Sequence, residues 1–437
     1  MNRIFTTIHT YRLPIAVGVA SFAIVACIIF VVTLNAATNT NLEAESGTQT
    51  NVTQVSDTSA SGSTAIKFGP VNTDPLTCDY NATTANFSTQ LSAAAAGKVI
   101  CLASGSYGTF TGTAKAVTIT KQSGATPSMY LEFRSGDKDF TIDGLAITGG
   151  DVVGNSGNYS DTNNPKNITI KNSTFTGALQ FEYIANSNIL LDSNTHNNID
   201  TNSTCTASPA RIHFSYSGNT TSGVTIQDSL FEGGNTDGIQ AGTGFTALRN
   251  EFRNIDEKSA DDCSHTDAVQ LLSANGAILR GNYIHHSADG IVAYDGVSNV
   301  TLEYNVIDLV GGRNGIELYS DTNSIIRYNT LVKRSTCEYS GMCGLVDLNH
   351  KTVDPAGSGT VVENNIVMAG INLNNGSTAS VNRNNMFVSG ASGSNFNGTP
   401  VFTGGANPTT WAGYFLTAGS PGLTNATDGG RVGIRNF

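Results

Sequence analysis

A polar residue, usually asparagine, recurs between residues 173 and 387 at the same place in a short repeated pattern. Each copy reads as a short strand of alternating polarity, then Asn or Ser, one further residue, and a bulky residue that is nearly always apolar. The polar positions are Ser173, Asn194, Ser229, Asn250, Asn282, Asn305, Asn329, Asn365 and Asn385. The bulky positions are Phe175, His196, Phe231, Phe252, Ile284, Ile307, Leu331, Val367 and Phe387. Successive bulky positions lie 20 to 36 residues apart, around a base period of 20 to 24.

This period predicts a solenoid, in which each repeat forms one coil stacked on the last. The longer intervals then mark loops inserted into individual coils. Identical amide side chains one strand spacing apart, ~4.8 Å, can hydrogen-bond up and down such a stack. Asn also tolerates the backbone dihedral of a tight turn, which gives a second reason for its choice.

Strand signals dominate the repeated region, whereas helical periodicity is nearly absent. Short β-branched segments such as 168–170, 224–226 and 300–302 are bounded by Gly, Asn, Asp or Ser, as strands usually are. One short helix is expected, within Phe87–Ala96. Strands this short cannot each bury a face alone, but parallel stacking gives every coil two neighbours and a continuous apolar interior. We therefore expect an all-β, parallel β-helix domain over residues 67–437.

The N-terminal part has a different composition. Residues 13–35 are uncharged and long enough to span a bilayer, and two arginines precede them. This predicts a transmembrane signal anchor over residues 13–35, a cytoplasmic segment over residues 1–12, and a C-terminal domain outside the cell membrane. Residues 36–66, rich in Ser, Thr and Asn, are expected to form a disordered stalk. The alternative is a long signal peptide that is cleaved to release a secreted protein.

Six of the seven cysteines follow the apolar segment, and an even count in an exported segment fits disulfides. Their order along the chain suggests three pairs. These are Cys78 with Cys101, Cys205 with Cys263, and Cys337 with Cys343. Because six cysteines allow 15 pairings, connectivity stays open at this point.

The charge balance limits the partners. The chain carries 34 acidic and 23 basic residues, for a formal net charge of −11. An acidic chain is a poor ligand for nucleic acid, so we expect no nucleic-acid partner. An acidic polysaccharide is also disfavoured, more weakly, unless a cation such as Ca²⁺ bridges it to the protein. We expect a monomer that binds a polysaccharide or cell-surface glycan.

The ends of the repeated region resemble those of a known superfamily. Ala93–Leu102, followed by Gly105–Gly108, is similar to the segment that caps right-handed parallel β-helices, the fold of pectate lyases and polygalacturonases. Pro400–Phe402 and Gly419–Pro421 look like the strand that closes them. The resemblance runs from about residue 78 to residue 437 and implies a right-handed helix. It identifies no specific enzyme family, because this fold carries lyases, hydrolases, epimerases and adhesins.

One partial motif argues against polygalacturonase activity. Asn235–Ile239 and Asp261–Cys263 look like the first two motifs of that family, which supply its catalytic aspartates. In the family the second motif leads straight into a strand, whereas here Ser264 to Thr266 intervene. The family's later Gly-His-Gly and Arg-Ile-Lys motifs are missing as well.

A second set of predicted strands precedes the asparagine strands and carries outward polar residues. Period two places one column outward, made of Gln180, His213, Gln240, Gln270, Val292 and Glu317. Glu182, Tyr294 and Tyr319 each stand two residues after a member of this column, so period two places them on the same side. Amides, an imidazole, carboxylates and tyrosines suit sugars, which need hydrogen bonds and a ring to stack on. We predict substrate binding by His213, Gln240, Gln270, Tyr294, Glu317 and Tyr319; the alternative is ordinary polar filler.

Three aspartates precede these strands at the same place in the repeat: Asp237, Asp267 and Asp289. Stacked carboxylates repel one another, so another interaction must offset this repulsion. They can bind Ca²⁺, share a proton in catalysis, or cap backbone N–H groups of the turns. His265 adjoins Asp267, and a histidine beside a carboxylate can act as a general base. We predict His265, Asp267 and Asp289 as catalytic and the three aspartates as a metal site, with capping as the alternative.

The sequence thus predicts a membrane-anchored, extracytoplasmic β-helix that acts on or binds polysaccharide, lyase-like or hydrolase-like. A lyase needs a basic residue on the face, and Arg211, Arg313 and Lys351 are the weak candidates. The alternatives are a non-catalytic glycan-binding adhesin and a surface structural protein.

Overall fold

The computed structural model describes residues 52–56, 64–68, 76–197, 210–214, 222–255, 266–337 and 342–436. The chain divides into two compact units, Met1–Leu76 and Thr77–Phe437. In the first unit, β1 (Val52–Ser56) and β2 (Thr64–Phe68) form an antiparallel pair. Strand β1 falls inside the segment expected to be a stalk, and β2 crosses its end.

The predicted signal anchor, residues 13–35, lies outside the described residues. Among the residues that the structure describes, no helix combines the length and the apolar character needed to cross a membrane. The anchor therefore stays a prediction.

The second unit opens with short strands and the one α-helix expected there. The helix, α2, covers Phe87–Ala93 and buries Phe87. The strands are β3 (Tyr80–Ala82), β4 (Val99–Leu102), β5 (Gly105–Phe110), β6 (Thr118–Lys121), β7 (Pro127–Phe133), β8 (Thr141–Asp143) and β9 (Ala146–Val153). They pair in parallel with one another and with the first full coil.

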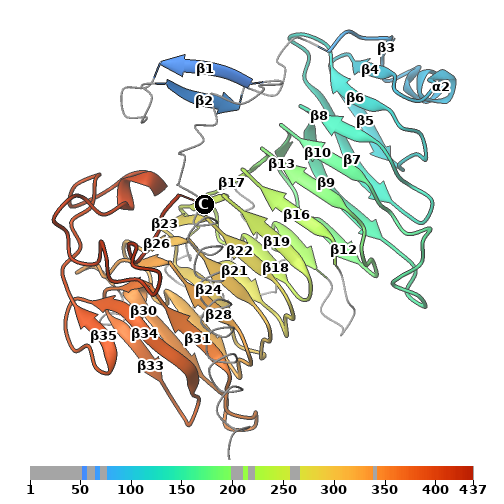
Figure 1. Ribbon diagram of the computed structural model, residues 1–437. Helices are drawn as coiled ribbons and strands as arrows, with labels where there is room; N and C mark the ends of the chain where they lie inside the picture. Colours follow the sequence, from blue (N-terminus) through green and yellow to red (C-terminus); the bar gives the residue numbers. More distant parts are fainter. Residues whose placement is uncertain are drawn as a thin grey trace, which may run out of the picture. The chain divides into compact units, whose positions relative to one another are not determined.

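From residue 168 each coil contributes three strands, and each strand pairs in parallel with the strand three places further along. Figure 1 shows these strands stacked in order along the second unit. We call the three resulting strand columns faces A, B and C.

Face A consists of β12 (Leu179–Glu182), β15 (Ile212–Phe214), β18 (Ile239–Ala241), β21 (Asp267–Leu271), β24 (Asp289–Ala293), β27 (Ile316–Tyr319), β30 (Leu345–Asn349) and β33 (Gly370–Leu373). Face B consists of β10 (Ile168–Lys171), β13 (Ile189–Asp192), β16 (Val224–Gln227), β19 (Phe245–Leu248), β22 (Ile278–Arg280), β25 (Thr301–Glu303), β28 (Ile325–Arg327) and β31 (Thr360–Glu363). Face C consists of β11 (Thr174–Phe175), β14 (Thr195–His196), β17 (Leu230–Glu232), β20 (Glu251–Arg253), β23 (Tyr283–His285), β26 (Val306–Asp308), β29 (Thr330–Leu331) and β32 (Ile366–Val367). The last elements are β34 (Ala379–Phe387), β35 (Ser394–Asn397) and two 3₁₀ turns, η2 (Met342–Gly344) and η3 (Trp411–Tyr414).

The asparagine column forms the predicted ladder between faces B and C. The Asn305 Oδ1 accepts from both the backbone N–H and the Nδ2 of Asn282, at 3.0 and 2.9 Å, and Asn329 repeats this with Asn305 at 3.0 Å each. The Nδ2 of Asn305 also donates to the Leu279 carbonyl at 2.9 Å. All of these groups are buried, so the ladder satisfies polar atoms that would otherwise be costly to bury.

Asn was also expected at this position because it tolerates the backbone dihedral of a tight turn, and this explanation is wrong for the ladder residue itself. The left-handed backbone belongs to the residue before it, as at Arg249 (φ 51°), Tyr304 (φ 57°) and Tyr328 (φ 57°). The ladder asparagine is therefore explained by its hydrogen bonds alone.

The interior is a continuous apolar core in which like residues stack. Phe175, His196, Phe231 and Phe252 form one column with ring centroids 4.6, 4.5 and 4.5 Å apart. His196 is fully buried and neither ring nitrogen has a hydrogen-bond partner. Burial lowers the pKa of His196 to about 3, so the ring is neutral and acts as one more aromatic layer.

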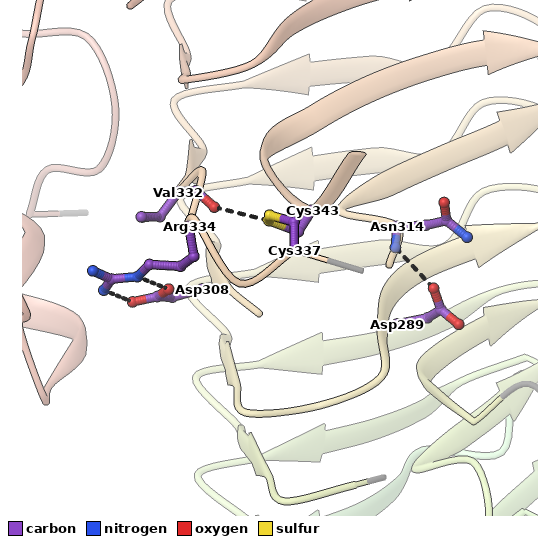
Figure 2. Close-up of a disulfide and its surroundings, with 7 residues drawn as sticks. All are labelled: Asp289, Asp308, Asn314, Val332, Arg334, Cys337 and Cys343. Carbon is purple, nitrogen blue, oxygen red and sulfur yellow. Dashed lines mark hydrogen bonds and ion pairs between the residues drawn. A yellow bond between two sulfur atoms is a disulfide. The ribbon is translucent and has the colours of Figure 1, made fainter. Parts of the chain in front are cut away.

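Two of the three predicted disulfides are present. Cys78 bonds to Cys101 on β4, and Cys337 bonds to Cys343 in η2 (Figure 2). Cys205 and Cys263 lie outside the described residues.

Candidate functional site

The strand register places the residues predicted for the outward column of face A in one column. Each member pairs with the next along the stack, from Gln180 to Glu317. The column then continues to Asp347 on β30, which pairs with Glu317. The sequence analysis did not include Asp347 among the site residues.

The first half of this column is polar and partly exposed. The Gln240 amide donates to Oε1 of Gln270 on the next strand, and at 3.5 Å to Oδ2 of Asp237. His213 is also partly exposed, and burial lowers its pKa. Val292, in contrast, is fully buried, so it separates the amide half of the column from the acidic half.

The acidic half centres on Glu317. The Tyr294 hydroxyl donates to its Oε2 at 3.0 Å, and Tyr319 stands two residues after Glu317 on the same strand. The two tyrosine rings meet edge to face with centroids 5.2 Å apart, and both remain partly exposed. Only 5% of Glu317 is exposed. Burial raises the pKa of Glu317 to about 7, helped by the charges of Asp347 and Asp289 and opposed by both tyrosines.

Asp347 lies beside Glu317 on the same face and is held from two sides. The Nδ2 of Asn374 donates to its Oδ1 at 2.6 Å, and the Nδ2 of Asn349 donates to its Oδ2 at 3.3 Å. Burial raises its pKa, and the two amides oppose that effect because they stabilise the carboxylate. Face A thus carries two adjacent carboxyl groups, each oriented by its own hydrogen bonds.

Asp237 and Asp289 cap the turns of the following coils. The Asp267 backbone N–H donates to Oδ1 of Asp237 at 2.9 Å, and the Asn314 backbone N–H donates to Oδ1 of Asp289 at 2.9 Å (Figure 2). Arg313 also binds Oδ2 of Asp289 at 2.5 Å. Asp237 is partly exposed, and the desolvation of its carboxyl group raises its pKa to about 7.

Asp267 differs from its two neighbours in the stack. It pairs with Asp289 in the strand register and is fully buried, yet neither carboxylate oxygen has a hydrogen-bond partner. Burial raises its pKa well above the ordinary value, and the charges of Asp237 and Asp289 add to that shift. The protonated form of this carboxyl group is therefore favoured in the fold.

The predicted catalytic and metal assignments of these aspartates stay predictions. His265 lies outside the described residues. Among the residues described, no group of three or more His, Cys, Asp or Glu side chains is arranged to hold a metal ion. His285, one coil on, lies on face C, where its Nε2 contacts Glu251 at 3.0 Å, and so does not join Asp267.

The basic residues considered for a lyase are engaged elsewhere. Arg211 is fully buried and donates to the carbonyls of Thr236 and Gly233, and burial lowers its pKa to about 10. Arg313 binds Asp289, and the Lys351 ammonium binds Oδ1 of Asp295 at 2.7 Å. Each of the three already has a partner, and Arg313 is held by Asp289 at the start of β24 on face A.

A family profile described as "Right handed beta helix region" matches residues 210–409. This range covers the coils whose parallel register was described above. The chain is a right-handed parallel β-helix protein. No curated protein matches the sequence of this β-helix.

Several solved structures resemble the β-helix at low sequence identity. The PL6 family alginate lyase AlyGC is 12% identical, with a TM-score of 0.36, and the match covers 82% of this chain and 58% of that one. The A-module of the Azotobacter vinelandii mannuronan C-5 epimerase AlgE6 is 13% identical, with a TM-score of 0.36 and coverages of 73% and 97%. The pectate lyase Pel9A is 14% identical, with a TM-score of 0.26 and coverages of 82% and 96%. The chain thus spans less than two thirds of the alginate lyase.

The chemistry that this β-helix can perform follows from face A itself. Glu317 can give or take a proton near neutral pH, because its pKa lies there. Asp347 supplies a second, oriented carboxyl group next to it. Tyr294 and Tyr319 add aromatic surface, and the glutamines add amide donors and acceptors. Together these groups suit general acid–base chemistry on a hydroxyl-rich ligand.

Proposed function

We propose that this β-helix binds an uncharged polysaccharide across face A and hydrolyses its glycosidic bonds, with Glu317 and Asp347 as the reacting pair. The observation that carries the proposal is their geometry: two carboxyl groups at paired positions of adjacent face A strands, each fixed by side-chain hydrogen bonds. Glycoside hydrolysis needs two carboxyl groups in different protonation states flanking the scissile bond.

Glu317 acts as the general acid in this scheme. With a pKa of about 7 it holds a proton in a large fraction of molecules at neutral pH. The proton passes to the glycosidic oxygen as the bond to the anomeric carbon breaks. The Tyr294 hydroxyl keeps the carboxyl group directed, and the partly exposed Tyr294 and Tyr319 offer rings on which a sugar can stack.

Asp347 acts as the nucleophile. Its two amide partners hold both oxygens and favour the ionised form. Paired strands are spaced ~4.8 Å apart, and both side chains leave the same face. Taken as a guide to the separation of the two carboxyl groups, this strand spacing is nearer the ≈ 5–5.5 Å of retaining glycosidases than the ≈ 6.5–9.5 Å of inverting enzymes, so we propose a retaining mechanism.

The charge of the face favours an uncharged substrate. Carboxyl groups crowd it at Glu317 and Asp347, and the nearby Arg211 and Arg313 are already bound to carbonyls and to Asp289. Among the described residues a uronate would therefore meet like charge there, and these two arginines already have other partners. A β-elimination also needs a base presented to the substrate, and Lys351 is paired with Asp295. Both points favour a hydrolase over a lyase.

We also propose that the protein acts outside the cell. Two disulfides support an exported domain, because such bonds persist in oxidising compartments. The uncharged run over residues 13–35 supports attachment to the membrane as a signal anchor, and release after signal cleavage is the alternative.

A panel of neutral and acidic polysaccharides, incubated with the whole protein, tests the proposal. We expect new reducing ends from a neutral polysaccharide and no ultraviolet absorbance of an unsaturated uronate. Glu317→Gln and Asp347→Asn should each lower the rate by at least about 100-fold, because each removes one of the two reacting carboxyl groups. Asp192→Asn on face B, a partly exposed carboxylate of similar chemistry, should leave the rate unchanged.

Other outcomes would contradict the hydrolase. Unsaturated products would show a lyase instead, and full activity in Asp347→Asn would remove the proposed pair. Retention of a glycan without any cleavage would favour a non-catalytic glycan receptor. The run of polar, partly exposed residues from Gln180 through Gln270 is the observation that keeps this second candidate in view.

A further inference from the structure

A cavity of about 310 Å³ lies on face C, away from the carboxyl pair of face A. Its walls come from β20 and β23, from the residues just before them, and from the C-terminal segment leading into η3. The lining residues are Arg249, Asn250, Glu251, Gly281, Tyr283, Thr409, Thr410 and Trp411. The volume is at the lower end of the range for small-molecule pockets, which suits a ligand the size of a mono- or disaccharide.

The charges that line this cavity are compensated by residues outside it. The Arg249 guanidinium binds Asp228 through two hydrogen bonds, at 2.8 and 2.6 Å. Glu251 binds Arg253 at 3.3 Å and contacts Nε2 of His285 at 3.0 Å. The cavity therefore offers strong donors and acceptors with little net charge, which disfavours phosphate, uronate and ammonium ligands.

The aromatic residues of the cavity are held in fixed positions. The Trp411 indole N–H donates to the Tyr304 carbonyl at 2.9 Å, and its ring meets Phe415 edge to face at 5.3 Å. Tyr283 stacks on His285 with centroids 4.1 Å apart. Because the indole donor is already used, what Trp411 offers a ligand is its ring. A rigid ring beside charged hydrogen-bonding groups is the combination that a sugar needs, since its C–H face stacks and its hydroxyls bond.

We propose that this cavity is a second carbohydrate site, which binds one uncharged sugar unit between Trp411 and Tyr283. Glu251 accepts hydrogen bonds from the sugar hydroxyls, and the hydroxyls of Thr409 and Thr410 complete the polar lining. The site lies on a different face from Glu317 and Asp347, so its binding does not depend on their chemistry.

Trp411 makes the test direct, because it is the single tryptophan of the chain. The emission of the whole protein is titrated with glucose, galactose, mannose, N-acetylglucosamine and cellobiose, and with glucuronate and glucosamine as charged comparisons. We expect a saturable change with at least one neutral sugar and weaker or no response to the charged ones.

Two matched variants decide whether Glu251 takes part. Glu251→Gln should weaken binding by about tenfold, because it removes charge-assisted hydrogen bonds. Glu232→Gln is the control: Glu232 binds Arg253 at 2.6 Å and is exposed to a similar degree, 38% against 39% of the side chain, but does not line the cavity. It should leave the titration unchanged.

Glu317→Gln and Asp347→Asn should also leave the titration unchanged, which separates this site from the proposed hydrolase. The proposal is overturned if no neutral sugar saturates the emission change. Tighter binding of a charged sugar, or equal effects of Glu251→Gln and Glu232→Gln, would overturn it as well.

Discussion

The Tyr294 hydroxyl donates a hydrogen bond of 3.0 Å to Oε2 of Glu317, joining two neighbouring strands of face A. A donor to a carboxylate stabilises its ionised form, whereas burial disfavours it. The pKa of Glu317, about 7, is the balance of these effects, with burial the larger. One aromatic residue thus both orients the carboxyl group of Glu317 and lowers its pKa against the larger effect of burial.

Replacing Tyr294 with phenylalanine should therefore raise the pKa of Glu317 above about 7. Hydrogen bonds to charged groups contribute about 1.5–3 kcal/mol, so the change is tenfold or more in the acid dissociation constant. If Glu317 is the general acid, the alkaline limb of the kcat/KM profile should move to higher pH. Tyr130→Phe is the control, because Tyr130 makes the same kind of bond to Asp151, at 2.7 Å, outside the pair. An unmoved limb in Tyr294→Phe would contradict this role.

The buried Asp267 should make the protein less stable as pH rises. In the unfolded chain its pKa is near 3.9, whereas burial holds it well above that value in the fold. Between these two values the folded state binds more protons, so the free energy of unfolding falls as pH increases. Asp267→Asn removes this dependence. We expect the variant to be more stable than the parent at alkaline pH, with the difference shrinking as the pH falls towards the unfolded-state pKa of the carboxyl group.

Urea unfolding at several pH values measures that difference. Asp228→Asn, at an exposed carboxylate, should leave the pH slope of the parent intact. A stability difference between Asp267→Asn and the parent that is the same at every pH would contradict the assignment of a buried, protonated carboxyl group.

The asparagine ladder should be a large contributor to stability. Asn305→Ala leaves the backbone N–H of Asn282 and the carbonyl of Leu279 without their partners. Each buried polar group left unsatisfied costs about 1–3 kcal/mol, so the loss should be about 2–6 kcal/mol in denaturant unfolding. Asn372→Ala, exposed on β33, should cost no more than about 0.5 kcal/mol. Similar losses at the two positions would argue against the ladder.

The two disulfides should differ in their contribution because they close loops of different length. Cys78–Cys101 spans 23 residues and Cys337–Cys343 spans 6. Loop-closure entropy then gives about 3 kcal/mol for the first and about 2 kcal/mol for the second. Double Cys→Ala variants, compared by chemical unfolding under oxidising conditions, measure both losses. A larger loss at the Cys337–Cys343 pair would contradict the entropic explanation.

The fold was predictable because the same short pattern recurs in every coil, so each copy supports the same assignment. A bulky residue two places after each ladder position fixed the coil period, and the outward column from Gln180 to Glu317 followed from period two alone. The left-handed residue was misplaced by one position, since sequence pattern does not show which turn residue takes positive φ. That residue is often not Asn, as Arg249 and Tyr304 show.

The site was only partly predictable, because burial and partner choice are tertiary properties. Val346-Asp347-Leu348 repeats the apolar-acidic-apolar pattern of Ile316-Glu317-Leu318. The repeat therefore contained a signal for Asp347, which the sequence analysis did not use. Nothing local distinguishes Asp267, whose carboxylate has no hydrogen-bond partner, from Asp289, whose carboxylate binds Arg313. Likewise, the cavity at Trp411 joins residues about 160 positions apart in sequence, which no motif connects.

A crystal structure of Glu317→Gln soaked with an oligosaccharide of a neutral substrate tests the central claim most directly. We predict sugar rings along face A, in contact with Tyr294 and Gln270, with a glycosidic oxygen within hydrogen-bond distance of residue 317 and an anomeric carbon facing Asp347. Sugar rings bound only on face B or face C, with face A empty at saturating ligand, would contradict it.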